Sequence, residues 1–197
     1  MDQFRSTAPI ACPDSWRVSR TDASASRMRP PATVTRIRRV TPNDHDGLQE
    51  FYARLSDESR RTRFLGRTSG IGAGQSTYFC TPDHAHREGF VAVVGSATRT
   101  DQIVGHVCVE PDEPATAEVA VAVADELQGH GLGRKLVEAA VAWARRDGVR
   151  TMTATMLAGN PAIQRLLTGL ALPSVAVPVG AGVIEVRIDL GVMRSAA

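Results

Sequence analysis

The chain has 197 residues, of which 43% are hydrophobic and 22% are charged, and its formal net charge is +2. These values are typical of a globular domain with one core, and so small a net charge does not point to a nucleic-acid partner. No apolar run approaches the ~20 residues of a membrane-spanning helix, and three cysteines without a CxxC pair favour neither a disulfide framework nor a zinc site. We therefore expect a cytoplasmic protein without membrane or nucleic-acid partners.

Residues 1–32 differ in composition from the rest of the chain. They are rich in Ser, Ala, Arg and Pro and show no sustained apolar period. Three aspartates among them argue against an organelle transit peptide, and the apolar stretch of a secretion signal is missing. We interpret this segment as a mobile extension that ends at the Pro30-Pro31 pair, which leaves residues 33–193 as the folded domain.

The folded part begins with a predicted strand and two predicted helices. Residues 33–40 alternate in the way of a half-buried or edge strand. Thr41 suits a helix N-cap, and the helix after it has one apolar face, formed by Leu48, Phe51, Tyr52 and Leu55. Ser56 predicts the cap of a second helix, and the glycine-rich residues 66–74 predict a flexible loop.

The second half of the chain alternates strands and helices. Strands are predicted over residues 89–97, 102–110, 117–123, 150–156, 173–179 and 183–190. A long amphipathic helix with Leu136, Val137, Ala140, Val141 and Ala144 on its buried face ends at Gly148, and a short helix follows the cap residue Asn160. The order of strand, two helices, three strands, helix, strand, helix and two strands predicts a mixed α/β sheet.

A glycine-rich loop connects the strand over residues 117–123 to the long helix. It is not a Walker loop, because Leu136 follows Lys135 where a Ser or Thr is required. It is not a dinucleotide fingerprint, which needs GxGxxG and an acid ~20 residues further on. The remaining pattern, Gln128-x-x-Gly131-x-Gly133, predicts a cradle of backbone N–H groups for a pyrophosphate, without a metal. A turn that serves only chain geometry is the alternative.

This loop resembles the acyl-CoA signature Q/R-x-x-G-x-G/A of the GNAT acyltransferase superfamily. The segment "FYARLSDESRRTRFLG" (residues 51–66) also resembles the Leu-Ser-x-Glu-Ser…Arg-Phe segment of bacterial protein lysine acetyltransferases of the Pat type. The likeness covers about residues 33–190. It implies a mixed, mostly antiparallel central sheet that is flanked by helices and splayed at the acyl-CoA site.

Glu118 is the candidate general base. It lies at the start of the strand before the loop, where alternation places Glu118, Ala120 and Ala122 on one face unless a bulge intervenes. In the Pat-type enzymes that this sequence resembles, a glutamate at the matching place acts as base, directly or through water. The alternative is a glutamate at the strand edge that pairs with a surface arginine.

The resemblance also implies which residues bind acetyl-CoA. The backbone groups of Val121 and Val123 would hold the pantetheine arm, and Asn160 would contact it as well as capping its helix. The pyrophosphate would lie on residues 128–134, namely Gln128, Gly129, His130, Gly131, Leu132, Gly133 and Arg134. Arg134 or Lys135 would reach a phosphate.

Two features depart from the superfamily pattern. The helix over residues 160–169 has no tyrosine where many members place a general acid, so either the thiolate leaves without one or the enzyme is slow. The residues "GLALP" (169–173) replace the usual aromatic-Gly-Phe ending. Elsewhere, "DHAHRE" (residues 83–88) is interpreted as a solvated loop rather than a metal cluster, and Cys108 as a small core residue rather than a nucleophile.

We therefore expect an N-acetyltransferase that uses acetyl-CoA and no metal. The acceptor favoured by the resemblance is a protein lysine, attacked in a ternary complex with Glu118 as base. A small-molecule amine acetyltransferase and a non-catalytic acyl-CoA sensor are the alternatives. The acidic residues 110–113 suit a cationic acceptor of either kind.

Overall fold

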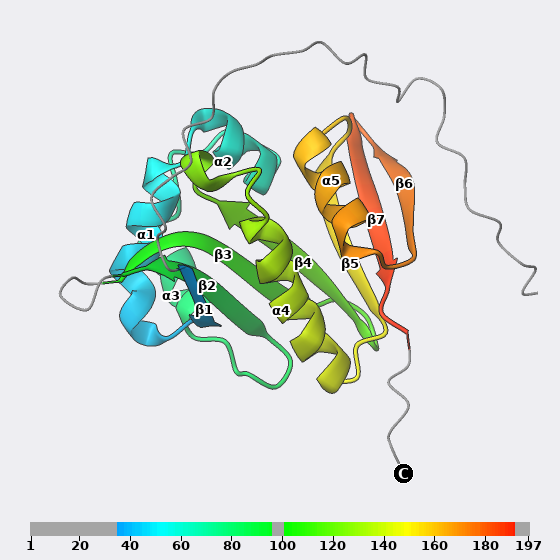
Figure 1. The fold of residues 1–197 in the computed structure, drawn as a ribbon, viewed down its shortest axis with the longest axis horizontal. Coiled ribbons are helices and arrows are strands. Elements are labelled where there is room, and N and C mark those ends of the chain that lie inside the picture. Colours follow the sequence, from blue (N-terminus) through cyan, green and yellow to red (C-terminus); the bar gives the residue numbers. More distant parts are fainter. Residues whose placement is uncertain (1–34, 96–100, 192–197) are drawn as a thin grey trace, which may run out of the picture. The chain divides into compact units, whose positions relative to one another are not determined.

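A computed structural model describes residues 35–95 and 101–191 (Figure 1). The strands are β1 (Thr35–Arg39), β2 (Glu88–Val94), β3 (Gln102–Pro111), β4 (Thr116–Val123), β5 (Thr151–Leu157), β6 (Ser174–Gly180) and β7 (Val183–Asp189). The helices are α1 (His45–Arg54), α2 (Asp57–Phe64), α3 (Ala73–Cys80), α4 (Leu132–Arg146) and α5 (Pro161–Leu170), with 3₁₀ turns at Pro42–Asp44 and Asp125–Leu127. The predicted extension over residues 1–32 lies outside the described residues.

The strands form one sheet in the order β1-β2-β3-β4-β5-β7-β6. All neighbouring strands are antiparallel except β4 and β5, which are parallel. This arrangement confirms the predicted mixed, mostly antiparallel sheet flanked by helices. No helix among the described residues is long and apolar enough to cross a membrane.

Helices cover both faces of the sheet, and β3 shows how its residues divide between them. Gly105 faces α4, because a Cβ built on it would lie 2.8 Å from Leu136 Cδ1. The next residue, His106, points the other way and approaches the Tyr52 hydroxyl of α1 at 2.9 Å. The predicted apolar face of α4 is buried throughout, and Gly148, just past its end, has a φ of +83°. The core therefore has two layers, one on each side of the sheet.

Helix α3 is the element that the sequence analysis missed. Residues 73–80 (AGQSTYFC) contain glycine, small polar and β-branched residues and show no strong apolar period. The helix forms because α1 packs against it: Ser76 is fully buried and its hydroxyl donates to the His45 carbonyl at 2.7 Å. The predicted loop over residues 66–74 therefore ends in a helix stabilised by tertiary contacts rather than by local propensity.

The first helix also begins later than predicted. Thr41 precedes a 3₁₀ turn, and the α-helix starts at His45. The Asp44 carboxylate accepts the Thr41 N–H at 2.7 Å and pairs with Arg38 at 2.6 Å. Burial would raise the pKa of Asp44, but these hydrogen bonds outweigh it and hold that pKa below its usual value. The side chain of Asp44 thus fixes the junction of β1 and α1.

The parallel strands β4 and β5 are paired only over a short length. Three residues of β4, from Thr116 to Glu118, pair with β5, and the strands then diverge. The register of β3 with β4 continues without a shift to Val123, so no bulge interrupts this part of the strand. Glu118 is therefore the last residue of β4 that pairs with β5, at the point where the sheet opens.

Candidate functional site

A cleft of about 620 Å³ occupies the opening between β4 and β5. It is walled by α2, by residues 119–123 of β4, by the glycine loop and the start of α4, by residues 154–156 of β5, and by α5. The lining includes the predicted site residues Val121, Val123, Gln128, Gly129, Gly131, Gly133, Arg134 and Asn160. Glu118, His130 and Leu132 are not part of it. Most of the predicted cofactor residues are thus brought together by the fold.

The glycine loop has the backbone of an open cradle. Gly129 and Gly131 have φ values of +77° and +81°, a region that side chains rarely adopt. A Cβ on Gly131 would have no atom within 4 Å, so space is free beside this residue, which lies directly before the N-terminus of α4. Arg134 and Arg165 add positive charge to the lining. An open backbone, a helix N-terminus and two cations fit a pyrophosphate group.

The side chain of Gln128 anchors this loop. Its Nε2 donates to the Ser59 hydroxyl at 3.0 Å and to the Val123 carbonyl at 3.1 Å. Asp125 accepts from the Ser56 N–H at 2.8 Å and from the Ser59 hydroxyl at 2.6 Å. Although burial opposes it, these serine hydrogen bonds hold the pKa of Asp125 below its usual value. The loop, α2 and the end of β4 are therefore tied together, a link that spacing in the sequence did not reveal.

Three other predicted site residues, Leu132, His130 and Asn160, differ in whether their side chains are buried, exposed or part of the cleft lining. Leu132 is buried, so its side chain belongs to the core, whereas His130 is exposed. The Asn160 Oδ1 accepts the N–H groups of Ala162 at 3.0 Å and Ile163 at 3.3 Å. Asn160 thus caps α5, as predicted, and lines the cleft as well.

Glu118 is exposed and faces away from α4. It lies opposite Glu110 of β3 and Thr153 of β5. Within residues 35–95 and 101–191, no ion pair joins Glu118 to an arginine. The interpretation of Glu118 as one half of a surface ion pair therefore finds no support; the residue is exposed and directly precedes Val119, the first β4 residue that lines the cleft.

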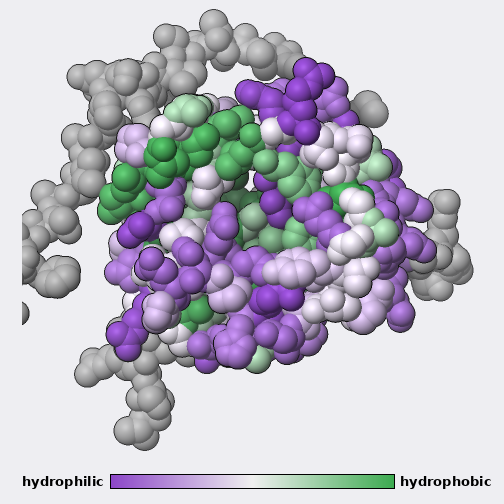
Figure 2. Space-filling view, turned by 180° about the vertical axis from the view of Figure 1, so that it is seen from behind, coloured by the Kyte–Doolittle hydropathy of each residue, from purple (hydrophilic) through white to green (hydrophobic). Residues whose placement is uncertain are grey.

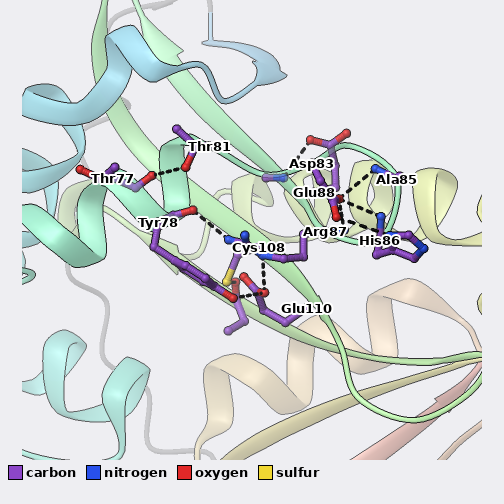
Figure 3. Close-up of polar contacts among 12 residues, drawn as sticks. Thr77, Tyr78, Thr81, Asp83, Ala85, His86, Arg87, Glu88, Cys108 and Glu110 are labelled. Carbon is purple, nitrogen blue, oxygen red and sulfur yellow. Dashed lines mark hydrogen bonds and ion pairs between the residues drawn. The ribbon is translucent and has the colours of Figure 1, made fainter.

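Glu110, by contrast, is held in place (Figure 3). Its Oε2 accepts from the Tyr78 hydroxyl and from Arg87 Nε, both at 2.8 Å. Arg87 also lies 3.6 Å from the centre of the Tyr78 ring and donates to the Tyr78 carbonyl at 2.8 Å. Tyr78 lies on α3, and Arg87 precedes β2, so only the fold could bring them to Glu110.

Arg63 of α2 is a cleft residue that the sequence analysis did not single out. Its Nη2 approaches the Cys108 sulfur at 3.3 Å, and its Nε is buried without a hydrogen-bond partner in the described part of the chain. Cys108 is only 5% exposed, and burial raises the pKa of its thiol. This environment supports the interpretation of Cys108 as a core residue, because a thiolate nucleophile requires a lowered pKa.

His106 and Tyr52 form a buried, hydrogen-bonded pair that is not part of the cleft lining. Burial lowers the pKa of His106 to about 3 and raises that of Tyr52 to about 12. Both are therefore neutral near pH 7, and neither is available as an acid or base for a ligand.

The "DHAHRE" segment is a turn in front of β2. Asp83 accepts the backbone N–H groups of Ala85, His86 and Arg87. Glu88 departs from the predicted solvated loop, because it is fully buried and pairs with Arg39 at 3.0 Å. Among the residues that the structure describes, no group of three or more His, Cys, Asp or Glu could hold a metal ion.

Comparisons with known proteins identify acetyltransferases as similar to this chain. The acetyltransferase PA5475 of Pseudomonas aeruginosa is 29% identical over 134 residues, which cover 68% of this chain and 72% of that protein. The GNAT domain of S. lividans PAT has a TM-score of 0.69 and 26% identity, covering 79% of this chain and 90% of that domain. The yncA protein of Salmonella typhimurium, solved with acetyl-CoA, has a TM-score of 0.63 and 21% identity, covering 83% and 96% of the two chains.

The model of the acetyltransferase (GNAT) family matches residues 54–169, from the end of α1 to the end of α5. This range contains the glycine loop, Glu118 and all the residues that line the cleft except Ile188. Because the match extends over more than half of the chain, the protein belongs to the acetyltransferase (GNAT) family and is an N-acetyltransferase that uses acetyl-CoA.

Proposed function

We propose that this enzyme acetylates a protein lysine, with Glu118 as the general base. The observation that carries the proposal is the position of Glu118, which is exposed, free of ion pairs within the described ranges, and located where β4 and β5 separate. A lysine amine is almost fully protonated at pH 7, since its usual pKa is about 10.4, so attack on a thioester requires removal of a proton. Glu118 accepts that proton directly or through a water.

The cleft supplies the binding groups for acetyl-CoA, which brings the activated acetyl thioester. Beyond Glu118, the edge of β4 is no longer paired with β5. The backbone groups of Val121 and Val123 on that edge can therefore pair with the amides of the pantetheine arm. The loop from Gln128 to Arg134 would hold the pyrophosphate.

The leaving thiolate needs no tyrosine from α5. An ordinary thiol has a pKa of about 8.5, so a thiolate is a weak base and a good leaving group. Of the two tyrosines, Tyr52 is buried against His106 and Tyr78 is hydrogen-bonded to Glu110. Neither occupies the place of the missing acid.

A protein lysine is the proposed acceptor because of two likenesses to Pat-type enzymes. One is the segment over residues 51–66, and the other is the solved GNAT domain of S. lividans PAT. A small cationic amine is the second candidate, favoured by the acidic residues Asp112 and Glu113 beside β4. The cysteine pattern favours a cytoplasmic location for either reaction.

The substitution Glu118→Gln tests the proposal. It preserves shape but removes the basic carboxylate, so kcat should fall by roughly 10²–10⁴-fold while the Kd for acetyl-CoA stays unchanged. Glu126→Gln makes the same change of charge at an exposed position in the 3₁₀ turn after β4, outside the cleft lining, and it should leave kcat near the wild-type value. If Glu118→Gln turns over like the wild type, the base is another group.

A further inference from the structure

Three valines of the outermost strand β6 are unusually exposed. Val175, Val177 and Val179, here called the valine strip, are 49%, 43% and 55% exposed. Among the described residues, only Leu65 and Tyr78 are other large hydrophobic side chains with such exposure. Figure 2 shows apolar side chains gathered in a band beside a hollow in the surface. Apolar side chains gathered on a protein surface often mark a site of interaction.

The register of the sheet connects this strip to Glu118. Glu110 pairs with Glu118, Glu118 with Thr153, Thr153 with Arg187, and Arg187 with Val175. Residues paired across strands point to the same face of a sheet. Val175 and Glu118 therefore lie on one face, the face that is turned away from α4.

The distance along this row of paired residues, from Glu118 to Val175, limits which acceptors could contact both ends. Three strand spacings of about 4.8 Å separate Glu118 from Val175, a total of about 14 Å. A small amine held at Glu118 cannot also cover an apolar side chain at that distance. An extended polypeptide rises about 3.3–3.6 Å per residue, so about four residues span it.

The charges along the row favour a cation at one end only. In the middle of the row, Glu185 neutralises the charge of Arg187: its Oε1 lies 2.7 Å from Arg187 Nε. The negative charge of Glu110 is neutralised by an ion pair with Arg87, but Glu118 has no ion-pair partner in the described ranges. Glu118 is therefore a carboxylate without an ion pair at one end of the row, and apolar surface lies at the Val175 end.

We infer that this face of the sheet docks an extended segment of the acceptor protein. Its lysine lies at Glu118, and an apolar side chain about four residues away covers Val175 and Val177. The inference rests on the proposed function and specifies its acceptor class. A second copy of this chain is a less suitable occupant, because Pro178 interrupts the N–H groups that β6 could offer to another strand.

The test uses two synthetic peptides and two variants. The peptides carry one lysine and differ only in having leucine or serine four residues from it on either side. The double variant Val175→Ser/Val177→Ser replaces the two valines of the strip that are proposed to contact the acceptor, and Ala176→Ser changes an exposed residue of the same strand that points to the opposite face. A lysine amide serves as the small amine.

The wild type should acetylate the leucine peptide with a KM at least tenfold below that of the serine peptide, since burying an aliphatic side chain is worth about that factor. The double variant should abolish this preference, with kcat and the acetyl-CoA Kd unchanged, and Ala176→Ser should retain it. Equal KM values for both peptides in the wild type would overturn the inference, as would acetylation of the lysine amide but of neither peptide.

Two further outcomes distinguish a failure of the proposed function from a failure of the docking inference. If no amine is acetylated although acetyl-CoA binds, the proposed function itself is wrong. If the wild type sediments as a dimer that the double variant dissociates, with the peptide preference unchanged, a second copy covers the strip instead.

Discussion

Replacing Gly131 with alanine should separate the role of the glycine loop in folding from its role in binding. The residue has a φ of +81°, and an alanine there costs about 1–2 kcal/mol in the left-handed region. For a domain of this size each kcal/mol lowers Tm by about 2–4 °C, so Gly131→Ala should melt about 2–8 °C below the wild type. The new methyl group meets no protein atom within 4 Å, so packing adds no further penalty.

The same methyl group enters the space where the loop faces the cleft. We expect it to weaken acetyl-CoA binding at least tenfold, because bare backbone allows the close approach of a phosphate. A tenfold weaker Kd removes about 1.4 kcal/mol of ligand-induced stabilisation at saturating ligand. The rise in Tm caused by acetyl-CoA should then shrink by about 3–6 °C.

Gly148 provides a matched control at the other end of the same helix. Its φ is +83°, and a Cβ there would also have no neighbour within 4 Å, but it does not line the cleft. Gly148→Ala should therefore lower Tm by the same amount and leave the acetyl-CoA shift intact. Equal acetyl-CoA shifts in the two variants, measured by differential scanning fluorimetry, would refute the assignment of the loop to the cofactor.

Two smaller predictions concern stability. Burial lowers the pKa of His106 from 6.5 to about 3, so between these pH values the unfolded state binds more protons than the folded state. The free energy of unfolding should therefore fall as the pH drops through this window. His106→Gln should flatten this pH dependence, as measured by urea titrations. Asn160→Ala removes the cap of α5 and should cost about 1 kcal/mol, visible as a lower Tm, whereas Asn160→Asp should retain most of the stability because aspartate also caps.

Local sequence patterns were sufficient to predict most elements of this fold. The apolar face of α4, the cap at Asn160 and the glycine loop depend on residues within a few positions of one another, and such patterns act through the same short-range physics wherever they occur. The family resemblance lay in these local segments as well. The fold class, the enzyme class and the use of acetyl-CoA could therefore be predicted before the tertiary structure was known.

Tertiary structure decided the features that join distant segments. Helix α3 has little local preference for a helix and forms because Ser76 and Phe79 are buried by other elements. The contacts of Tyr78 and Arg87 with Glu110 depend on the packing of α3 and β2 beside β3. The row from Glu118 to Val175 follows from strand register, which depends on pairing across many residues of intervening chain. A linear pattern carries no record of those pairings, because they are selected by the burial of the whole sheet and not by any one strand.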